Sequence, residues 1–137
     1  MEMDWGQIGK QLIEEAKLAR EQSYSPYSGF AVGAALLTAG GKVYRGCNVE
    51  NASFGATVCA ERTAAVKAVS EGEREFLAIA VVGGRESLQK RCTPCGICRQ
   101  FLSEWGDPEG FRIFLGDGQQ EPESYLLREL LPLSFDL

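Results

Sequence analysis

Two short cysteine segments have the residue types and spacing of a metal site. The first spans residues 57–62 with the sequence TVCAER, and the second spans residues 93–98 with the sequence TPCGIC. Each begins with Thr, which often caps a helix N-terminus, and Pro94 suits the first position of a helix. We therefore expect each segment to open a helix. Two such helix ends would bring three thiolates to one ion: Cys59, Cys95 and Cys98.

The donor set favours zinc. Thiolates suit Zn²⁺, and three protein ligands leave one position open for water, as in catalytic rather than structural sites. Cys92 is a fourth candidate, but it precedes Pro94 and lies outside the expected helix. If Cys92 were also a ligand, the site would be a closed, purely structural Cys₄ site. We expect Cys47 and Cys92 to be small buried hydrophobic residues instead. A redox role for Cys95-x-x-Cys98 would leave Cys59-x-Glu61 unexplained.

Glu61 is the expected catalytic proton carrier. Zinc lowers the pKa of water toward roughly 7, and a carboxylate beside it can accept the proton and deliver it to a substrate. The chain has no His that could serve instead. Residues 59 and 61 would face different ways within a regular helix, so this interpretation requires Cys59 at the extreme helix end. The alternative is that Glu61 is an ordinary surface residue.

Three thiolates on Zn²⁺ leave a net charge of −1, which weakens the metal as a Lewis acid. Two helix N-termini directed at the sulfurs would partly offset this charge. Arg62 and Arg99, each adjacent in sequence to a site residue, are further candidates for the same task. The alternative for either Arg is a surface charge.

The expected elements predict an α/β protein. Helical spacing of apolar residues and the cysteine segments predict helices over residues 4–22, 58–69, 94–105 and 124–131. Apolar runs predict strands over residues 30–38, 42–49, 76–83 and 111–115, with a short edge strand over residues 119–122. The pair Gly40-Gly41 is a hairpin signal between the first two strands. This order implies a three-layer α/β/α sandwich around a mixed five-stranded sheet.

Composition restricts the compartment and the partners. At 137 residues the chain fits one domain, residues 1–137. A formal charge of −5 argues against nucleic acid and anionic membranes as partners. The first ten residues lack the apolar core of a signal peptide, and no apolar run approaches the roughly 18 residues of a membrane span. Five cysteines without a secretory signal favour a reduced, cytoplasmic protein over a disulfide framework.

The chain resembles the small, homotetrameric cytidine deaminases over nearly its whole length. The resemblance is carried by SPYSxF at 25–30, GAAL at 33–36, GxNVENA at 46–52, CAERT at 59–63, PCGxCRQ at 94–100 and LLPxxF at 130–135. The C-x-E … P-C-x-x-C pattern is shared by many zinc deaminases. Asn48-x-Glu50-Asn51 discriminates better, because members that deaminate other aminopyrimidine compounds, such as blasticidin S, lack that pair.

The resemblance implies an activity and its contacts. The activity is zinc-dependent deamination of cytidine and 2′-deoxycytidine to uridine and 2′-deoxyuridine, in pyrimidine salvage, with one zinc per chain. Asn48 and Glu50 would bind the ribose 3′-hydroxyl, and residues two apart on a strand end do point the same way. Phe30 would pack on the nucleoside, and the Ala60 backbone would contact the base. Phe135 would stack on a pyrimidine bound to a neighbouring subunit of a homotetramer.

Other interpretations stay open at this point. Asn48 and Glu50 could merely cap loops, and Phe30 could be plain core. Phe54 stands where the family often has Tyr, and Gly29 stands where Lys is common. The protein could be a related deaminase of another nucleoside, a base or a polynucleotide, although the negative charge and the absence of a basic stripe disfavour the last. It could also be a Cys₄ zinc module for protein contacts.

Overall fold

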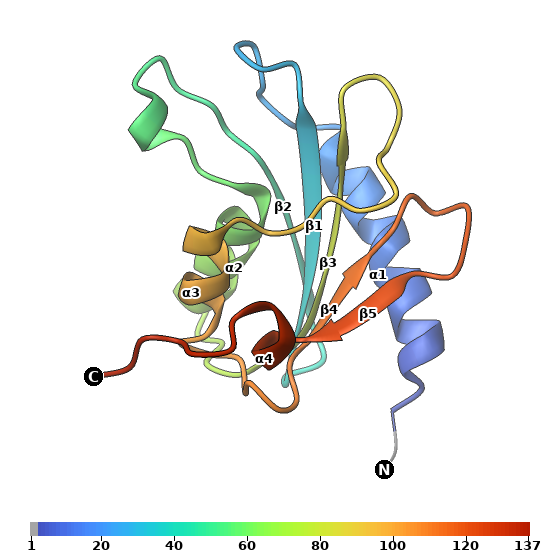
Figure 1. Ribbon diagram of the computed structural model, residues 1–137, viewed down its shortest axis with the longest axis vertical. Helices are drawn as coiled ribbons and strands as arrows, with labels where there is room; N and C mark the ends of the chain where they lie inside the picture. The colour runs from blue at the N-terminus through green and yellow to red at the C-terminus, as the bar shows by residue number, and fades with distance from the viewer. Residues whose placement is uncertain (1–2) are drawn as a thin grey trace.

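A five-stranded sheet with helices on both faces makes up the protein (Figure 1). The computed structural model describes residues 3–137. The elements are α1 (Trp5–Arg20), β1 (Ala31–Thr38), β2 (Val43–Cys47), the 3₁₀ turn η1 (Phe54–Ala56), α2 (Ala60–Ser70), β3 (Phe76–Gly84), α3 (Gly96–Leu102), β4 (Arg112–Leu115), β5 (Glu123–Leu126) and α4 (Leu127–Leu130). Among these residues, no helix combines the length and the apolar character needed to cross a membrane.

The sheet is mixed and forms the middle of three layers. Its strand order is β2-β1-β3-β4-β5, in which β3 and β4 pair in parallel and the other neighbours are antiparallel. Side chains alternate between the two faces of a strand. Ala35 of β1 therefore packs under α1, while Ala34 and Leu36 join the core beneath α2. Figure 1 shows α1 on one face and α2 with α3 on the other. The predicted three-layer sandwich is confirmed.

Two glycines allow the helices to rest directly on the sheet backbone. A methyl group on Gly46 of β2 would lie 2.5 Å from the Ala60 carbonyl oxygen at the start of α2 and would overlap the Ala64 nitrogen. On the opposite face, a methyl group on Gly33 of β1 would lie 2.5 Å from the Arg20 nitrogen at the end of α1. Backbone atoms therefore set the heights of α1 and of α2, which begins directly after Cys59, above the sheet.

Both cysteine-bearing helices begin later than the sequence predicts. Cys59 and Cys95, rather than Thr57 and Thr93, occupy the N-cap positions, and their backbone is extended. The third helix also ends at Leu102 instead of residue 105. Residues 103–105 continue as tighter hydrogen-bonded turns, and the Trp105 carbonyl accepts from the Phe76 N–H at 3.0 Å, at the start of β3.

The C-terminal elements also differ from the prediction. The edge strand predicted at 119–122 is Glu123–Leu126, and the helix predicted over 124–131 is reduced to the single turn Leu127–Leu130. The register of β5 against β4 pairs Glu123 with Leu115 and Leu126 with Arg112. Residues 116–122 are therefore needed as the connection between these strands. Pro122 could not donate a ladder hydrogen bond in any case.

Candidate active site

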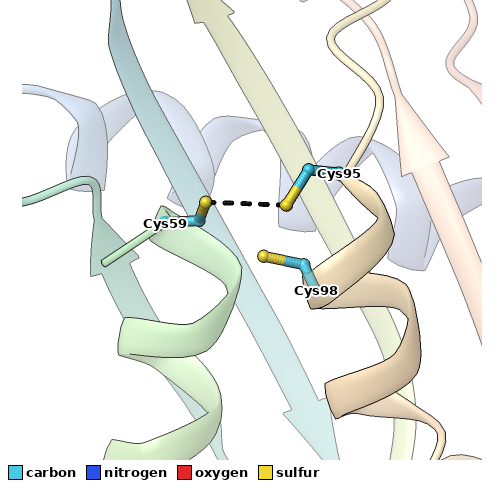
Figure 2. Close-up of side chains that lie close together, drawn as sticks. All are labelled: Cys59, Cys95 and Cys98. Atoms are coloured by element: carbon cyan, nitrogen blue, oxygen red, sulfur yellow. Dashed lines mark hydrogen bonds between the residues drawn. The ribbon is translucent and has the colours of Figure 1, made fainter. Parts of the chain in front are cut away.

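Three cysteine thiols converge between α2 and α3. Cys59 precedes the first turn of α2, Cys95 precedes that of α3, and Cys98 lies within it. Their sulfur atoms all lie within 4.8 Å of one another, and the sulfurs of Cys59 and Cys95 are 3.8 Å apart. Figure 2 shows the thiols pointing toward a common space between the two helices. The juxtaposition predicted for these three residues is present.

The sulfur spacing fits a zinc ion. Zn–S bonds of about 2.3 Å at tetrahedral angles place two sulfurs about 3.8 Å apart, which is the separation of Cys59 and Cys95. Neither N-cap cysteine makes a side-chain capping hydrogen bond, so both sulfurs are free to face the metal. In the described part of the chain, the cluster consists of Cys59, Cys95 and Cys98 and does not include Cys92. The arrangement leaves a fourth position for water, as a catalytic site requires.

Cys92 lies away from the cluster as a neutral thiol. A methyl group added to Gly83 of β3 would meet the Cys92 sulfur at 2.6 Å and the Phe30 ring at 3.0 Å, so both side chains cover this glycine. Burial, followed by the charges of Glu61 and Cys59, raises the pKa of Cys92 to about 11. Cys92 is thus a packing residue over β3 and lies outside the group of three thiols.

Glu61 is the second residue of α2 and is only 4% exposed. Because Cys59 is the N-cap and not part of the regular helix, the two side chains can serve one site although they are two residues apart. Burial raises the pKa of Glu61 to about 7, and the neighbouring Cys59 charge acts in the same direction. A carboxyl group with a pKa near neutrality can both accept and return a proton. Glu61 is therefore not the surface residue that the alternative interpretation requires.

The positive charge near the sulfurs comes from Arg62. Its Nη2 lies 3.7 Å from the Cys59 sulfur and also donates to the Thr57 carbonyl at 3.2 Å. The hydrogen bond with the Cys98 thiol, followed by that from Arg62, lowers the pKa of Cys59 to about 5. Arg99 instead donates to the backbone carbonyls of Pro94 and Leu130. Of the two candidates, only Arg62 makes a hydrogen bond to a cysteine sulfur of the site.

Asn48 follows the end of β2 and is 8% exposed. Its Nδ2 donates to the Phe30 carbonyl at 2.8 Å, and its Oδ1 accepts from the Val32 N–H at 2.9 Å. The Ser23 hydroxyl donates to the same Oδ1, and no motif in the sequence predicts this contact. An amide nitrogen has two hydrogens. Asn48 therefore orders the chain around Phe30 and keeps one N–H donor for a further partner.

Glu50 orders the preceding loop. Its carboxylate accepts from the backbone N–H groups of Tyr27 and Ser28, at 2.9 and 3.1 Å, and from the Ser28 hydroxyl. The Ser28 hydroxyl bond holds the pKa of Glu50 below its usual value, which keeps the carboxylate charged. Glu50 thus does cap a loop, and its remaining lone pairs can accept from a ligand as well.

A cavity of about 340 Å³ lies beside Glu50. Its other lining residues are Tyr27, Ser28, Phe54 and Thr57. The rings of Tyr27 and Phe54 meet edge to face, with centroids 5.8 Å apart. Sequence reasoning did not assign Tyr27, Ser28 and Thr57 to the site, although the motifs at 25–30 and the capping position at 57 were visible. The cavity joins Glu50 to the segment that leads into Cys59.

The remaining predicted contacts differ in how exposed they are. Ala60 is fully buried at the start of α2, while Phe30 is half-buried over Gly83. Phe135 is 69% exposed near the C-terminus, where its backbone contacts Gln100 of α3. A single chain therefore does not enclose the Phe135 ring.

The comparison with known proteins decides the family. The model of the cytidine and deoxycytidylate deaminase zinc-binding region matches residues 7–111. The chain belongs to this family. Zinc is accordingly its cofactor, as the three converging thiols indicate. The predicted resemblance to cytidine deaminases is confirmed.

Relatives and solved structures of the family cover almost the whole chain. The cytidine deaminase of Halalkalibacterium halodurans is 50% identical over 124 residues, which are 90% of this chain and 91% of the relative. That of Mycobacterium tuberculosis is 42% identical over 136 residues, which are 99% and 92% of the two chains. The crystal structure of cytidine deaminase from Burkholderia pseudomallei superposes with a TM-score of 0.82 at 49% identity, covering 91% of this chain and 97% of that one.

Proposed function

We propose that this protein hydrolyses cytidine and 2′-deoxycytidine to uridine and 2′-deoxyuridine with release of ammonia. One zinc per chain would be held by Cys59, Cys95 and Cys98, in a single deaminase domain over residues 1–137. The observation that carries the proposal is the placement of the buried Glu61 carboxyl beside three converging thiols. Relatives that are named cytidine deaminases and are up to 50% identical support the substrate class.

Glu61 moves the protons of the proposed reaction. When bound, zinc supplies Lewis acidity that lowers the pKa of water, so that water can act as a nucleophile near pH 7. Glu61 would accept one proton of the water and pass it to the pyrimidine ring nitrogen while the water oxygen bonds to the amine-bearing ring carbon. Glu61 would then take the second proton from that oxygen and deliver it to the amine nitrogen. The carbon–nitrogen bond breaks, which leaves a ring carbonyl and releases ammonia. Its burial, at 4% exposure, limits contact between the carboxyl group and bulk solvent.

We propose that Asn48 and Glu50 bind the sugar. Each also makes hydrogen bonds to the loop that carries Phe30 and Tyr27. What remains is one N–H on Asn48 and free lone pairs on the Glu50 carboxylate, and a ribose hydroxyl can accept from the first and donate to the second. The same side chains would then order the loop and bind the sugar. Phe30 and the Ala60 backbone would contact the part of the nucleoside that lies between the sugar-binding residues and the zinc.

Loss of cytidine absorbance with the purified zinc protein tests the proposal, with cytosine and CMP measured beside it. We expect cytidine and 2′-deoxycytidine to be deaminated far faster than cytosine. A protein that prefers cytosine or CMP would instead be a related deaminase with a different substrate. The formal charge of −5 makes a polynucleotide substrate the weakest alternative.

Replacement of Glu50 by Ala should weaken catalysis on cytidine much more than on cytosine, because cytosine has no ribose to contact. The measurement is kcat/KM on both compounds. Ser28→Ala is the matched control, since it removes the hydroxyl bond to Glu50 and leaves the carboxylate in place. Equal losses on the two substrates in Glu50→Ala would show that Glu50 only supports the loop.

We further propose a cytoplasmic homotetramer that acts in pyrimidine salvage. Apolar side chains remain exposed on one chain over α2, α3 and the C-terminus: Val66, Ile97, Leu133 and Phe135. Closed homo-oligomers are the usual way to cover such residues. All five cysteines are free thiols, which suits a reducing compartment. The site would be completed by Phe135 of a neighbouring subunit.

Replacement of Phe135 by Ala should raise KM for cytidine by about 2- to 10-fold, the range expected for one aromatic contact, with zinc content unchanged. Leu137→Ala, which shortens another exposed apolar side chain two residues further on, is the control and should leave KM unchanged. Light scattering should report about four times the 14.9 kDa chain mass. An active monomer at assay concentration would contradict the shared site.

A further inference from the structure

Helix α3 begins with two of the three site thiols, those of Cys95 and Cys98, and also contacts the C-terminal end of the chain. Directly after Cys98, Arg99 donates to the Leu130 carbonyl at 2.8 Å, at the end of α4. The next residue, Gln100, contacts Phe135: its Nε2 donates to the Phe135 carbonyl at 3.0 Å, and its Oε1 accepts from the Phe135 N–H at 3.1 Å. One short helix therefore connects the candidate zinc site to the C-terminal tail, which we define as residues 132–137 (Figure 1).

The Gln100 carboxamide engages both backbone groups of a single residue. This is the pairing that a neighbouring strand would offer, and two bonds fix the orientation of the Phe135 backbone as well as its position. No other hydrogen bond recorded within residues 3–137 involves the tail, and the tail contains no helix or strand. Gln100 is thus the polar anchor that holds the Phe135 backbone, and with it the base of the Phe135 side chain, against α3.

We propose that Gln100 is a positioning residue for the deaminase, acting on substrate through Phe135 and without contacting the substrate itself. This inference rests on the proposed function, in which the Phe135 ring covers a pyrimidine in a neighbouring subunit. An anchored tail presents the ring in place, whereas a free tail must be ordered each time substrate binds. Loss of the anchor therefore weakens substrate binding and leaves the zinc-and-Glu61 chemistry intact.

The test compares Gln100→Met with the wild type in two backgrounds. Methionine has nearly the length of glutamine but forms neither hydrogen bond, and position 100 is only half-buried, so the fold should tolerate the change. Because Gln100 acts only through Phe135, we expect KM for cytidine to rise by at most about 2- to 10-fold, the range for loss of the ring itself, with kcat within about twofold. In a Phe135→Ala background, Gln100→Met should raise KM no further.

Amide hydrogen exchange of the C-terminal peptide provides a readout that does not depend on activity. The Phe135 amide should exchange faster in Gln100→Met than in the wild type. Glu104→Gln, an exposed change just beyond α3, is the control and should alter neither exchange nor KM. Unchanged exchange in Gln100→Met, or an equal rise in KM in both backgrounds, would overturn the proposal. If the wild type does not deaminate cytidine, the proposed function fails while the exchange measurement still decides whether the anchor exists.

Discussion

Replacement of Glu61 by Gln is expected to lower the turnover of cytidine by at least about 10²–10⁴-fold, the contribution typical of a general acid–base group. Glutamine matches the shape of the carboxylate but cannot carry a proton between water and the pyrimidine. Because Glu61 is buried and its pKa is raised to about 7, removal of the charge should not destabilise the fold. Turnover and zinc content should be measured on the same preparation.

A matched substitution separates this effect from a general disturbance of α2. Glu71 lies at the exposed C-cap of the same helix, so Glu71→Gln removes an equal charge far from the thiols. We expect it to retain wild-type turnover. Near-normal turnover in Glu61→Gln would remove Glu61 from the mechanism, whatever the behaviour of Glu71→Gln.

Each of three substitutions should abolish zinc binding and with it the activity: Cys59→Ala, Cys95→Ala and Cys98→Ala. Each variant retains only two of the three thiols, which is too few for a stable catalytic zinc site. The purified wild type should contain about one zinc per chain. Metal analysis should be paired with circular dichroism, because Cys98 is fully buried and its truncation also leaves a small void.

The two remaining cysteines are internal controls for this experiment. Cys47 contacts the Gln22 carbonyl at 3.4 Å, and Cys92 covers Gly83, so both lie outside the cluster. Cys47→Ser and Cys92→Ser should therefore keep about one zinc per chain. Loss of zinc in Cys92→Ser would show that the ligand set is wrong and would revive the closed Cys₄ alternative.

Most of the architecture was predictable because its signals are local. Strands β1, β3 and β4 are apolar runs, Gly40-Gly41 marks the hairpin to β2, and α1 has helical spacing, so most of the layers could be expected from local patterns. The errors occur where a distant partner decides the outcome. Beyond α3, residues 103–105 form tighter turns whose last carbonyl, that of Trp105, pairs with the distant Phe76. Residues 123–126 form a strand because β4 offers them an unpaired edge, and no local pattern encodes that edge.

The candidate site shows the same division. The three thiols and Glu61 were predictable because their spacing reflects the chemistry itself. The local partners of Asn48 and Glu50 were not, because the Ser23 and Ser28 contacts depend on how the loops fold back. The Gln100–Phe135 pairing spans 35 positions and involves a tail without regular structure. Contacts of that kind leave no periodic trace in a sequence.

Because β2 approaches α2 closely at Gly46, we expect most substitutions in the core to leave the position of α2 unchanged. Main-chain atoms of Ala60 and Ala64 rest against Gly46, so no side chain of variable length lies between this strand and the helix that begins beside Cys59. Apolar substitutions elsewhere in the core change the stability of the packing between the layers. They do not change the distance between β2 and α2 at Gly46. Sequence drift can therefore spread through much of the interior while the start of α2, beside Cys59, keeps its height above the sheet. Gly46 has no such freedom, since even one added methyl group would displace the helix.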